Sequence, residues 1–429
     1  MAARACALEI LDQVITRKQA LDHTLEQTRS LKSLEPRDRA LVRMLVATTL
    51  RRLGQIDALI EKAVEKAVPE NPALRNILRL GVTQIIFMDI PDHAAVDTTV
   101  TLAERGSMEK QKAFVNGVLR TITRTGREWL SLQDEVRLNT PEWLLKLWID
   151  DYGLRTAADI AKANLSEAPL DITIKDPESV NFWASNFKAT QMTTGTLRKI
   201  SGGAVQDLPG FEGGHWWVQD ASAAIPARLM GDIKDQHVVD LCAAPGGKTL
   251  QLASRGAFVT AIDRSTARLK RLQQNIERTG LQKRVNILAA DAATWKTADP
   301  LPYILLDAPC SATGTIRRHP DVPHLKTPQD ITHLSRVQSE ILAHAFELLM
   351  PGGILIYCTC SLQKTEGEIQ IENLLQSRPN AQRLPITKEE LGGFDEALTE
   401  DGDLRILPFH QAALGGMDGF YIARLTKTA

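Results

Sequence analysis

The sequence predicts a multidomain protein with an N-terminal all-α domain, a small α/β middle region and a C-terminal α/β domain on a mostly parallel sheet. The chain has 429 residues, more than one ordinary domain contains. Apolar residues recur at helical spacing over residues 1–130, whereas short apolar runs alternate with turns and helices from residue 206.

The region 1–130 has helical periodicity and no strand-like alternation. The pattern is clearest at Leu8, Leu11, Ile15, Ile56, Leu59, Ile60, Leu74, Ile77, Leu78 and Val82. Proline or glycine interrupts it at Pro36, Gly54, Pro72 and Pro91. We therefore expect several short helices that pack into one domain.

Residues 138–205 have a different character. Pro141 opens a helix, because proline is common in the first helical turn. An apolar, β-rich piece covers Leu170–Ile174, and a second helix is expected at Val180–Phe187. This stretch is interpreted as a small α/β subdomain or an elaborated linker.

The region 206–429 repeats the order strand, turn, helix. Its expected strands are 238–241, 257–262, 285–288, 303–306, 353–357 and 420–425. This alternation is typical of a doubly wound, mostly parallel sheet. Such sheets bind ligands at the carboxyl ends of their strands. Asp240, Asp263, Asp291, Asp307 and Cys360 all stand at or just after strand ends, so we expect one polar crevice.

A glycine-rich turn follows the first of these strands and opens a helix. It consists of Cys242, Ala243, Ala244, Pro245, Gly246, Gly247 and Lys248. Glycine permits a tight turn and close approach of a ligand, and the helix start offers N–H groups to an anion. A Walker A loop is excluded because Cys242 stands where its first glycine belongs, and no dinucleotide fingerprint is present.

S-adenosylmethionine fits this arrangement. Its amino-acid moiety would lie on the turn, Asp263 would accept from the ribose hydroxyls, and Asp291 would accept from the adenine amino group. In the simpler alternative these acids only cap helices and turns. The alignment of all the strand ends favours the ligand.

Two cysteines follow the later strands. Cys310 lies in the segment 307–314, Asp-Ala-Pro-Cys-Ser-Ala-Thr-Gly, and Cys360 lies in Thr-Cys-Ser. Methyltransferases that act on exocyclic amino groups usually have an aromatic residue at the position of Cys310. A thiol there indicates different chemistry, and neighbouring strand ends can bring both thiols to one pocket.

Methylation of carbon 5 of cytosine needs such a set. A thiolate must add to carbon 6, an acid must protonate ring nitrogen 3, and a further group must assist release. Asp307, Cys310 and Cys360 can supply these functions.

Two alternatives remain for the cysteines. Buried cysteines are often inert, and we expect Cys242 and Cys358 to be structural. A zinc site from Cys242, Cys310, Cys358 and Cys360 is conceivable, but their spacing is poor for zinc. We therefore expect no metal.

These motifs together resemble the RNA cytosine-5 methyltransferases of the RsmB/NOP family. The resemblance implies a Rossmann-like class I methyltransferase domain over 206–429, with Cys360 as nucleophile and Cys310 assisting release. It also implies that 242–248, Asp263, Asp291 and Asp307 bind S-adenosylmethionine. Cys358 departs from the family pattern, which usually has a small residue there.

The N-terminal region resembles the NusB-type RNA-binding helical fold through segments 91–96 and 114–120. Segments 316–321 and 417–424 are similar to the branch of the family that acts on small-subunit ribosomal RNA. The resemblance therefore implies that RNA is the partner.

The overall charge does not itself favour a nucleic acid, since 51 basic residues face 52 acidic ones. RNA binding would need a local basic patch. Arg317, Arg318 and His319 follow the Cys310 segment, so we expect phosphate contacts there. A solvated loop is the alternative.

The first residues lack a signal-peptide pattern, and no run of about 18 apolar residues occurs. Five cysteines in a long chain do not indicate a disulfide framework. We expect a cytoplasmic monomer with reduced thiols and no membrane partner.

Other functions remain open. A class I methyltransferase could act on DNA, protein or another RNA such as tRNA, or the chain could be a non-catalytic RNA-binding assembly factor. DNA enzymes place their nucleophile at the Pro-Cys position, so the additional Thr-Cys-Ser cysteine argues against DNA. The intact cysteines and glycine turn argue against a non-catalytic factor.

Overall fold

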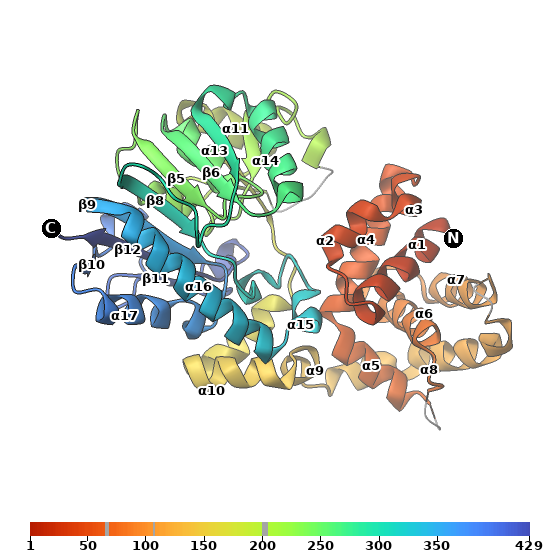
Figure 1. Ribbon diagram of the computed structural model, residues 1–429. Helices are drawn as coiled ribbons and strands as arrows, with labels where there is room; N and C mark the ends of the chain where they lie inside the picture. The colour runs from red at the N-terminus through yellow and green to blue at the C-terminus, as the bar shows by residue number, and fades with distance from the viewer. Residues whose placement is uncertain (65–67, 106–107, 200–204) are drawn as a thin grey trace. The chain divides into compact units, whose positions relative to one another are not determined.

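The computed structural model describes residues 1–64, 68–105, 108–199 and 205–429. The chain forms two compact units. The first contains Met1–Ser166 and Ile316–Lys326, and the second contains Glu167–Thr315 and Thr327–Ala429. The first unit is helical, whereas the second contains the sheets (Figure 1).

The helical unit is built from short helices. They are α1 (Ala2–Leu11), α2 (Leu21–Gln27), α3 (Arg29–Lys32), α4 (Pro36–Arg51), α5 (Leu53–Lys62), α6 (Pro72–Val82), α7 (Asp92–Arg105), α8 (Lys112–Ser131), α9 (Glu135–Asn139) and α10 (Glu142–Asn164). The expected breaks are where helices begin: α4 starts at Pro36, and α6 starts at Pro72. The Asn71 side chain caps α6 by accepting from two of its N–H groups. Buried aliphatic residues of α1, α4, α5, α6 and α8 form one core.

The helical unit extends beyond residue 130. Helices α9 and α10 belong to it, so its first segment ends at Ser166. The expected helix after Pro141 is present as α10, but it packs with the helical unit and not with the middle region to which we assigned it. Periodicity identifies a helix but does not show which core it joins.

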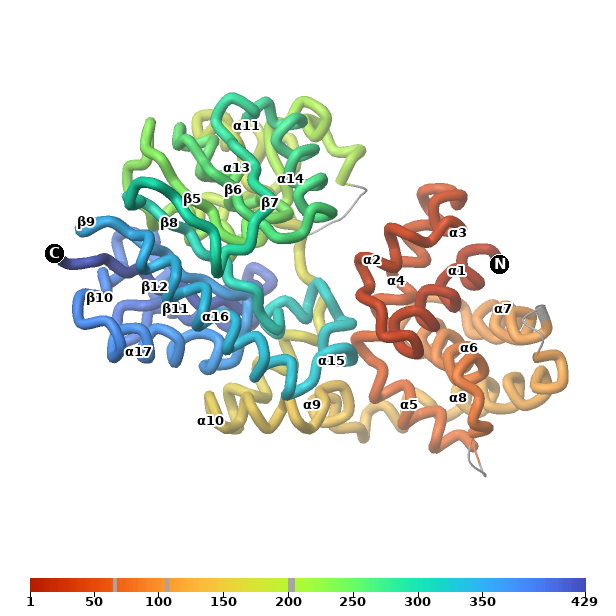
Figure 2. Tube along the Cα trace, in the orientation of Figure 1, coloured from red at the N-terminus to blue at the C-terminus, as the bar shows by residue number. Residues whose placement is uncertain are grey.

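A distant segment completes the helical unit. Ile316–Lys326, which contains the short helix α15 (Val322–Leu325), folds with it. Asp321 Oδ2 accepts from the Leu21 N–H at 2.8 Å, and Arg51 donates to the Arg317 carbonyl at 3.0 Å. In Figure 2 this segment is the cyan stretch of tube that carries the label α15. The helical unit is therefore discontinuous in sequence.

The second unit begins with a small antiparallel sheet in the order β2-β3-β1-β4. Its strands are β1 (Leu170–Ile174), β2 (Thr190–Gln191), β3 (Leu197–Lys199) and β4 (Trp216–Val218). Helix α11 (Val180–Phe187) packs Trp183 and Phe187 against this sheet. The expected strand and helix in this region are thus confirmed.

The main sheet of the second unit has the order β10-β12-β9-β8-β5-β6-β7, with β11 paired to β12. Its strands are β5 (His237–Leu241), β6 (Phe258–Asp263), β7 (Val285–Ala289), β8 (Leu301–Asp307), β9 (Leu349–Thr359), β10 (Ala381–Arg383), β11 (Leu404–Ile406) and β12 (Phe420–Lys427). The strands from β9 to β7 run parallel, whereas β10, β11 and β12 pair antiparallel. The mostly parallel sheet predicted from the sequence is confirmed, with an antiparallel addition at one side.

Helices cover both faces of this sheet (Figure 1). Helices α16 (Pro328–Leu348) and α17 (Glu368–Ser377) pack on the face that carries Val239, Leu306 and Tyr357. Helices α12 (Ile225–Arg228), α13 (Gly247–Ser254) and α14 (Thr266–Thr279) pack on the opposite face. With both faces buried, side chains that are free to bind a ligand lie at the strand ends.

Among the described residues, no helix is both long enough and apolar enough to cross a membrane.

Candidate active site

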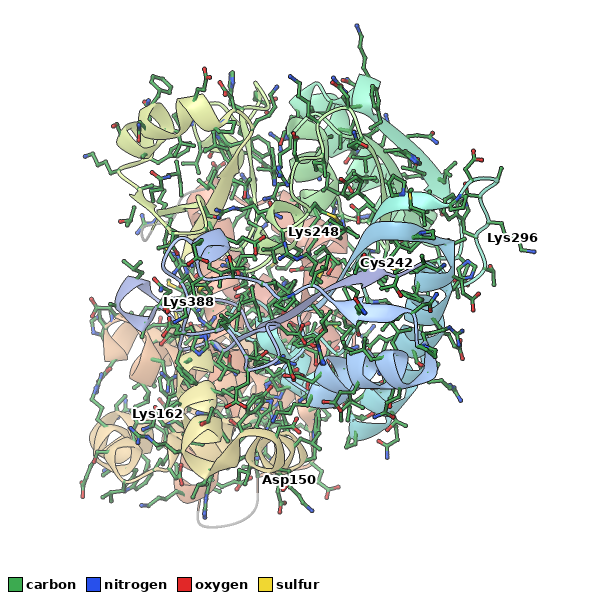
Figure 3. The ribbon with its side chains drawn as sticks, turned by 90° about the vertical axis from the view of Figure 1, so that its left-hand side faces the viewer. Asp150, Lys162, Cys242, Lys248, Lys296 and Lys388 are labelled. Carbon is green, nitrogen blue, oxygen red and sulfur yellow. The ribbon has the colours of Figure 1, made fainter. Side chains whose placement is uncertain are left out.

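Glycine shapes the turn between β5 and α13. Gly246 has φ +108°, and a Cβ there would lie 2.2 Å from Cδ1 of Leu272 on α14. Only glycine therefore combines this backbone conformation with so close an approach. Cys242 and Lys248 lie at the two ends of the turn (Figure 3). Gly246 is the N-cap of α13 and contributes no side-chain bond to the first helical N–H groups, which suits an anionic ligand.

Backbone hydrogen bonds tie this turn to β6. The Ala243 N–H donates to the Ile262 carbonyl at 2.9 Å, and the Ala244 N–H donates to Asp263 Oδ2 at 3.2 Å. Arg268 of α14 donates to the Ala244 carbonyl and forms an ion pair with Asp263 at 3.2 Å. The Pro245 carbonyl accepts from Asn275 of α14 at 3.2 Å. The turn therefore has a set position before any ligand binds.

Asp263 and Asp291 stand at the same sheet edge. Asp263 ends β6 and pairs in register with Ala289, the last residue of β7, two residues before Asp291. The Asp263 carboxylate is buried and accepts from the Ala244 and Ser265 N–H groups and from Arg268. A carboxylate has about four acceptor positions, which leaves room for a ribose hydroxyl. Asp291 is exposed.

Asp240 has an acceptor atom without a partner. Its side chain is fully buried; Oδ2 accepts from the Thr249 hydroxyl at 2.6 Å, but Oδ1 has no hydrogen bond within the described structure. Burial is the main cause that raises the pKa of Asp240 to about 7. A buried, unsatisfied carboxylate oxygen fits a cationic amino group, such as that of the methionine moiety of S-adenosylmethionine. Sequence reasoning placed Asp240 at a strand end without assigning it this function.

Lys248 and Asp307 form an ion pair, with Nζ 2.8 Å from Oδ2. Burial alone would lower the pKa of Lys248, but the charge of Asp307 and its hydrogen bond outweigh burial and raise that pKa. The ammonium also lies 5.0 Å from the centre of the Phe420 ring. The glycine turn and the end of β8 therefore share one buried charge pair.

Cys310 and Cys360 are in contact, with their sulfur atoms 3.4 Å apart. Adjacent strands bring them together, because Asp307 of β8 pairs with Cys358 of β9. The Gly314 N–H donates to the Cys360 carbonyl at 2.9 Å. The pKa of Cys310 is raised well above its usual value, first by the hydrogen bond with Cys360, then by burial and by the charges of Cys360 and Glu366. Cys310 is thus held as a neutral thiol.

The other two thiols of this unit differ. Burial, followed by the surrounding carboxylates, raises the pKa of Cys242 to about 12. Cys358 is fully buried, its thiol is 3.6 Å from Asp307 Oδ1, and burial raises its pKa strongly. Both are therefore weak nucleophiles.

Sequence reasoning missed one residue of the site, Glu366. It is fully buried, and its carboxylate accepts from Ser311 and Ser361, the residues that directly follow the two contacting cysteines. The only signal in the sequence is an acidic residue shortly after the Thr-Cys-Ser motif.

The basic segment after the Cys310 turn belongs to the helical unit. Arg317 is only 2% exposed, and its carbonyl accepts from Arg51. Its guanidinium is therefore not presented to a phosphate, contrary to our expectation, because the segment packs into the helical unit. Arg318 and His319 are half-buried, and His319 Nδ1 lies 3.5 Å from Asp22 Oδ2.

Within the described ranges, no group of three or more His, Cys, Asp or Glu side chains could hold a metal ion.

Comparison with known proteins identifies the family to which both units of the chain are similar. The family described as 16S rRNA methyltransferase RsmB/F matches residues 228–426, and the NusB family matches residues 1–124. The ribosomal RNA small subunit methyltransferase B of Vibrio vulnificus is 33% identical over 446 residues, covering 100% of both chains. The protein of the same name from Yersinia pestis is 34% identical over 439 residues, covering 99% of this chain and 98% of the relative.

The chain belongs to the RsmB/F family of methyltransferases. As a member, it is an S-adenosylmethionine-dependent enzyme, and its fold agrees with solved structures. The crystal structure of PH0851 matches with a TM-score of 0.78 at 24% identity, covering 99% of this chain and 98% of that one. The methyltransferase homolog from Pyrococcus horikoshii matches with a TM-score of 0.57 at 25% identity, covering 68% of this chain and 97% of that one.

Proposed function

We propose that this enzyme methylates carbon 5 of a cytosine in small-subunit ribosomal RNA, with Cys360 as nucleophile and Cys310 assisting release. The observation that carries the proposal is the 3.4 Å contact between the two sulfur atoms, next to the Lys248–Asp307 ion pair. Carbon-5 methylation needs a thiol nucleophile and a group that assists release, whereas methylation of an exocyclic amine needs neither. The small-subunit target follows from the names of the relatives, which are ribosomal RNA small subunit methyltransferases.

In the first step the Cys360 sulfur forms a bond to carbon 6, and ring nitrogen 3 gains a proton. A free thiol of pKa about 8.5 is only roughly 3% ionised at neutral pH. The Lys248 ammonium interacts electrostatically with Cys360. The proton that the Cys360 thiol gives up can reach nitrogen 3 through the carboxylate of Asp307, which a hydrogen bond from Lys248 holds in place.

Addition makes carbon 5 nucleophilic, so it takes the methyl group from the sulfonium of S-adenosylmethionine. The proton on carbon 5 must then leave, and the bond between Cys360 and carbon 6 must break. The strongest cause of the raised pKa of Cys310 is its hydrogen bond with Cys360. Bonding of Cys360 to carbon 6 removes that cause, so the Cys310 thiol loses its proton to solvent more readily, and the resulting thiolate can take the proton from carbon 5.

We also propose that the helical unit binds the RNA, with Arg318 and His319 as phosphate contacts. The NusB match over residues 1–124 supports an RNA-binding role for this unit. Both side chains are partly exposed.

The decisive experiment compares covalent adducts of the full-length protein with its RNA. Cys360→Ala should form neither product nor adduct, because the bond-forming atom is lost. Cys310→Ala should accumulate a protein–RNA adduct that survives denaturing electrophoresis, because attack proceeds but release is slow. Cys6→Ala, which removes a buried thiol of the helical unit, is the control and should turn over normally.

The reverse pattern, an adduct in Cys360→Ala and none in Cys310→Ala, would exchange the two roles. Absence of adduct in both variants would contradict covalent catalysis. Bisulfite sequencing of small-subunit RNA from a deletion strain tests the target, since one cytosine should lose its methyl group.

A further inference from the structure

We propose that Glu366 is a positioning residue that holds the Cys310 turn and the Cys360 turn at the separation the two thiols need. The mechanistic consequence rests on the proposed function. The positioning itself rests on contacts within the second unit.

The Glu366 carboxylate connects both turns. Oε1 accepts from the Ser311 N–H at 2.9 Å, and Oε2 accepts from the Ser361 hydroxyl at 2.5 Å. The Ser311 hydroxyl also donates to Oε2. Ser311 follows Cys310 and Ser361 follows Cys360 in the chain, so one carboxylate holds the residue next to each thiol.

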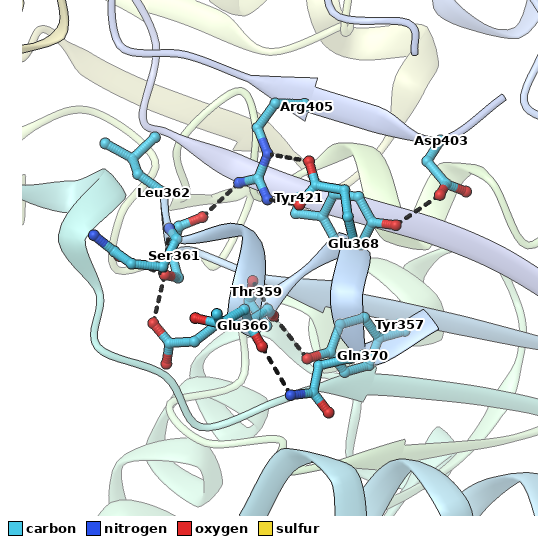
Figure 4. A network of polar contacts seen from close by, with 12 residues as sticks. Tyr357, Thr359, Ser361, Leu362, Glu366, Glu368, Gln370, Asp403, Arg405 and Tyr421 are labelled. Carbon is cyan, nitrogen blue, oxygen red and sulfur yellow. Dashed lines mark hydrogen bonds and ion pairs between the residues drawn. The ribbon is translucent and has the colours of Figure 1, made fainter. Parts of the chain in front are cut away.

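Glu366 is itself hydrogen-bonded to neighbouring elements (Figure 4). Its backbone carbonyl accepts from the Tyr357 hydroxyl at 2.8 Å and from the Thr359 hydroxyl at 3.3 Å, both on β9. Gln338 of α16 donates to its Oε1 at 2.9 Å. The carboxylate therefore has a set position relative to the strand that ends at the Cys360 turn.

The use of a carboxylate here needs a reason. A buried charge is costly unless it is fully hydrogen-bonded, and Glu366 has no exposed surface. The Ser311 and Ser361 hydroxyls are already 3.2 Å apart and could bond directly. A hydroxyl pair can rotate, however, whereas an acceptor shared by a backbone N–H and two hydroxyls sets the direction of each bond.

The charge has a second effect on the thiol pair. It is one of the causes that raise the pKa of Cys310, after the contact with Cys360 and burial. Glu366 thus helps to keep Cys310 as a thiol while Cys360 attacks. The hydrogen bonds of Glu366 hold the turns of both cysteines, whereas its charge raises the pKa of Cys310.

Other contacts between the turns do not depend on Glu366. The Gly314 N–H donates to the Cys360 carbonyl, and the Leu362 N–H donates to the Thr313 hydroxyl at 3.0 Å. We therefore expect a Glu366 variant to fold with displaced cysteines. Glu366→Gln suits this test because an amide NH2 in place of Oε2 cannot accept from the Ser311 and Ser361 hydroxyls as the carboxylate does.

The experiment compares Glu366→Gln with Glu372→Gln, which makes the same change at an exposed position of α17. Each is combined with Cys310→Ala, and the rate of RNA adduct formation is measured at saturating S-adenosylmethionine. Glu366→Gln should slow adduct formation roughly 100-fold, the size expected when reacting atoms are displaced by about 1 Å. Its affinity for S-adenosylmethionine should change less than about twofold, because the hydrogen bonds of Glu366 join it to the cysteine turns, β9 and α16. Glu372→Gln should match the parent.

A second measurement does not need RNA. Phenylarsine oxide condenses with two adjacent thiols, forming two sulfur–arsenic bonds and releasing water. With both cysteines present, the parent enzyme should bind it at Cys310 and Cys360, and Glu366→Gln should bind it at least tenfold more weakly. Equal arsenical binding would overturn the positioning role even if the proposed reaction were wrong. Weakened binding with no adduct in any variant would support the positioning and contradict the proposed function.

If Glu366→Gln does not fold, Glu366→Asp keeps the charge but shortens the side chain. A normal melting temperature together with slower adduct formation and weaker arsenical binding would support the proposal. Normal rates in that variant would contradict it.

Discussion

The glycine turn and the two cysteine turns lie at the same edge of the sheet but are held in different ways. The glycine turn is positioned by main-chain contacts: the Ala243 N–H bonds to β6, and Gly246 packs where no Cβ fits. The cysteine turns depend on side chains, because Glu366 accepts from Ser311 and Ser361.

This difference suits what each region must do. A turn that receives the same ligand in every reaction gains from a rigid backbone. The cysteine turns must accommodate a sulfur atom that bonds to carbon and is later released, and hydroxyl donors can adjust to this without refolding. Variants in each region should therefore change one function and leave the other intact.

The largest effect is expected for Gly314→Ala in the Cys310 turn. A Cβ there would lie 2.1 Å from the Gly419 carbonyl oxygen, a backbone atom that no rotamer change can move. The turn must shift, and adduct formation should fall by roughly 100-fold, as measured by gel quantification in the Cys310→Ala background. Affinity for S-adenosylmethionine by calorimetry should be unchanged; a joint loss of both functions would show that the regions are not separable.

Asp263→Ala should weaken S-adenosylmethionine binding by about 1–3 kcal/mol, the value of a lost buried hydrogen-bond acceptor. The variant also leaves the Ala244 N–H without its acceptor, so part of the loss reflects the turn itself. Calorimetry with S-adenosylmethionine and with adenosine alone separates the two effects. Unchanged affinity for both ligands would remove Asp263 from the binding site.

Gly246→Ala should cost about 1–2 kcal/mol in ligand affinity, because a non-glycine residue with positive φ is strained. Its new Cβ would meet the end of the Leu272 side chain, which can move, so the effect should be smaller than for Gly314→Ala. Arsenical binding by the thiol pair should remain normal. Gly231→Ala, also at positive φ but with no neighbour within 4 Å, controls for backbone strain alone.

The smallest expected effect concerns pH. The pKa of Asp240 is raised to about 7, so the free enzyme holds this carboxyl protonated below that pH. If the cationic amino group of S-adenosylmethionine needs the ionised form, affinity should rise about fivefold between pH 6 and pH 7 and then approach a plateau. Asp240→Asn should abolish this dependence in calorimetry.

The free energy of unfolding should depend on pH with the opposite sign and should fall as the pH rises. The raised pKa means that the folded state holds this proton more tightly than the unfolded chain. The stabilisation is therefore fully present below the ordinary pKa of about 3.9 and is lost as pH rises through 7. The free energy of unfolding is measured against pH for the parent and for Asp240→Asn, which corrects for the other titrating groups. If the difference between the two does not change over that range, the raised pKa is contradicted.

Much of the second unit could be predicted from the sequence. Apolar runs located β5, β6, β7 and β8 to within about two residues, because buried parallel strands carry a strong local signal. The motifs around Cys310 and Cys360 also indicated that the thiols would share a pocket. Both inferences depend on residues that are close in sequence or lie on neighbouring strands.

Three features could not be predicted in this way. Nothing in the sequence distinguishes Arg317 from an exposed arginine, because it is the packing of its segment that buries it. Glu366 takes its role from partners on β8, β9 and α16, which no local pattern reveals. The antiparallel strand β12 was expected only as a late strand, since pairing direction depends on tertiary contacts.

The discontinuity of the helical unit has a consequence for synthesis. Leu21 and Arg51 bond to residues of Ile316–Lys326, a segment made about 150 residues after Ser166. At roughly 5–20 residues per second, the ribosome needs about 10–30 s to cover that distance. During this interval the helical unit lacks its last segment, and the residues that leave the ribosome are those that form strands β1 to β8. The helical unit therefore cannot complete its native contacts on the ribosome until four of the eight strands of the main sheet have been translated.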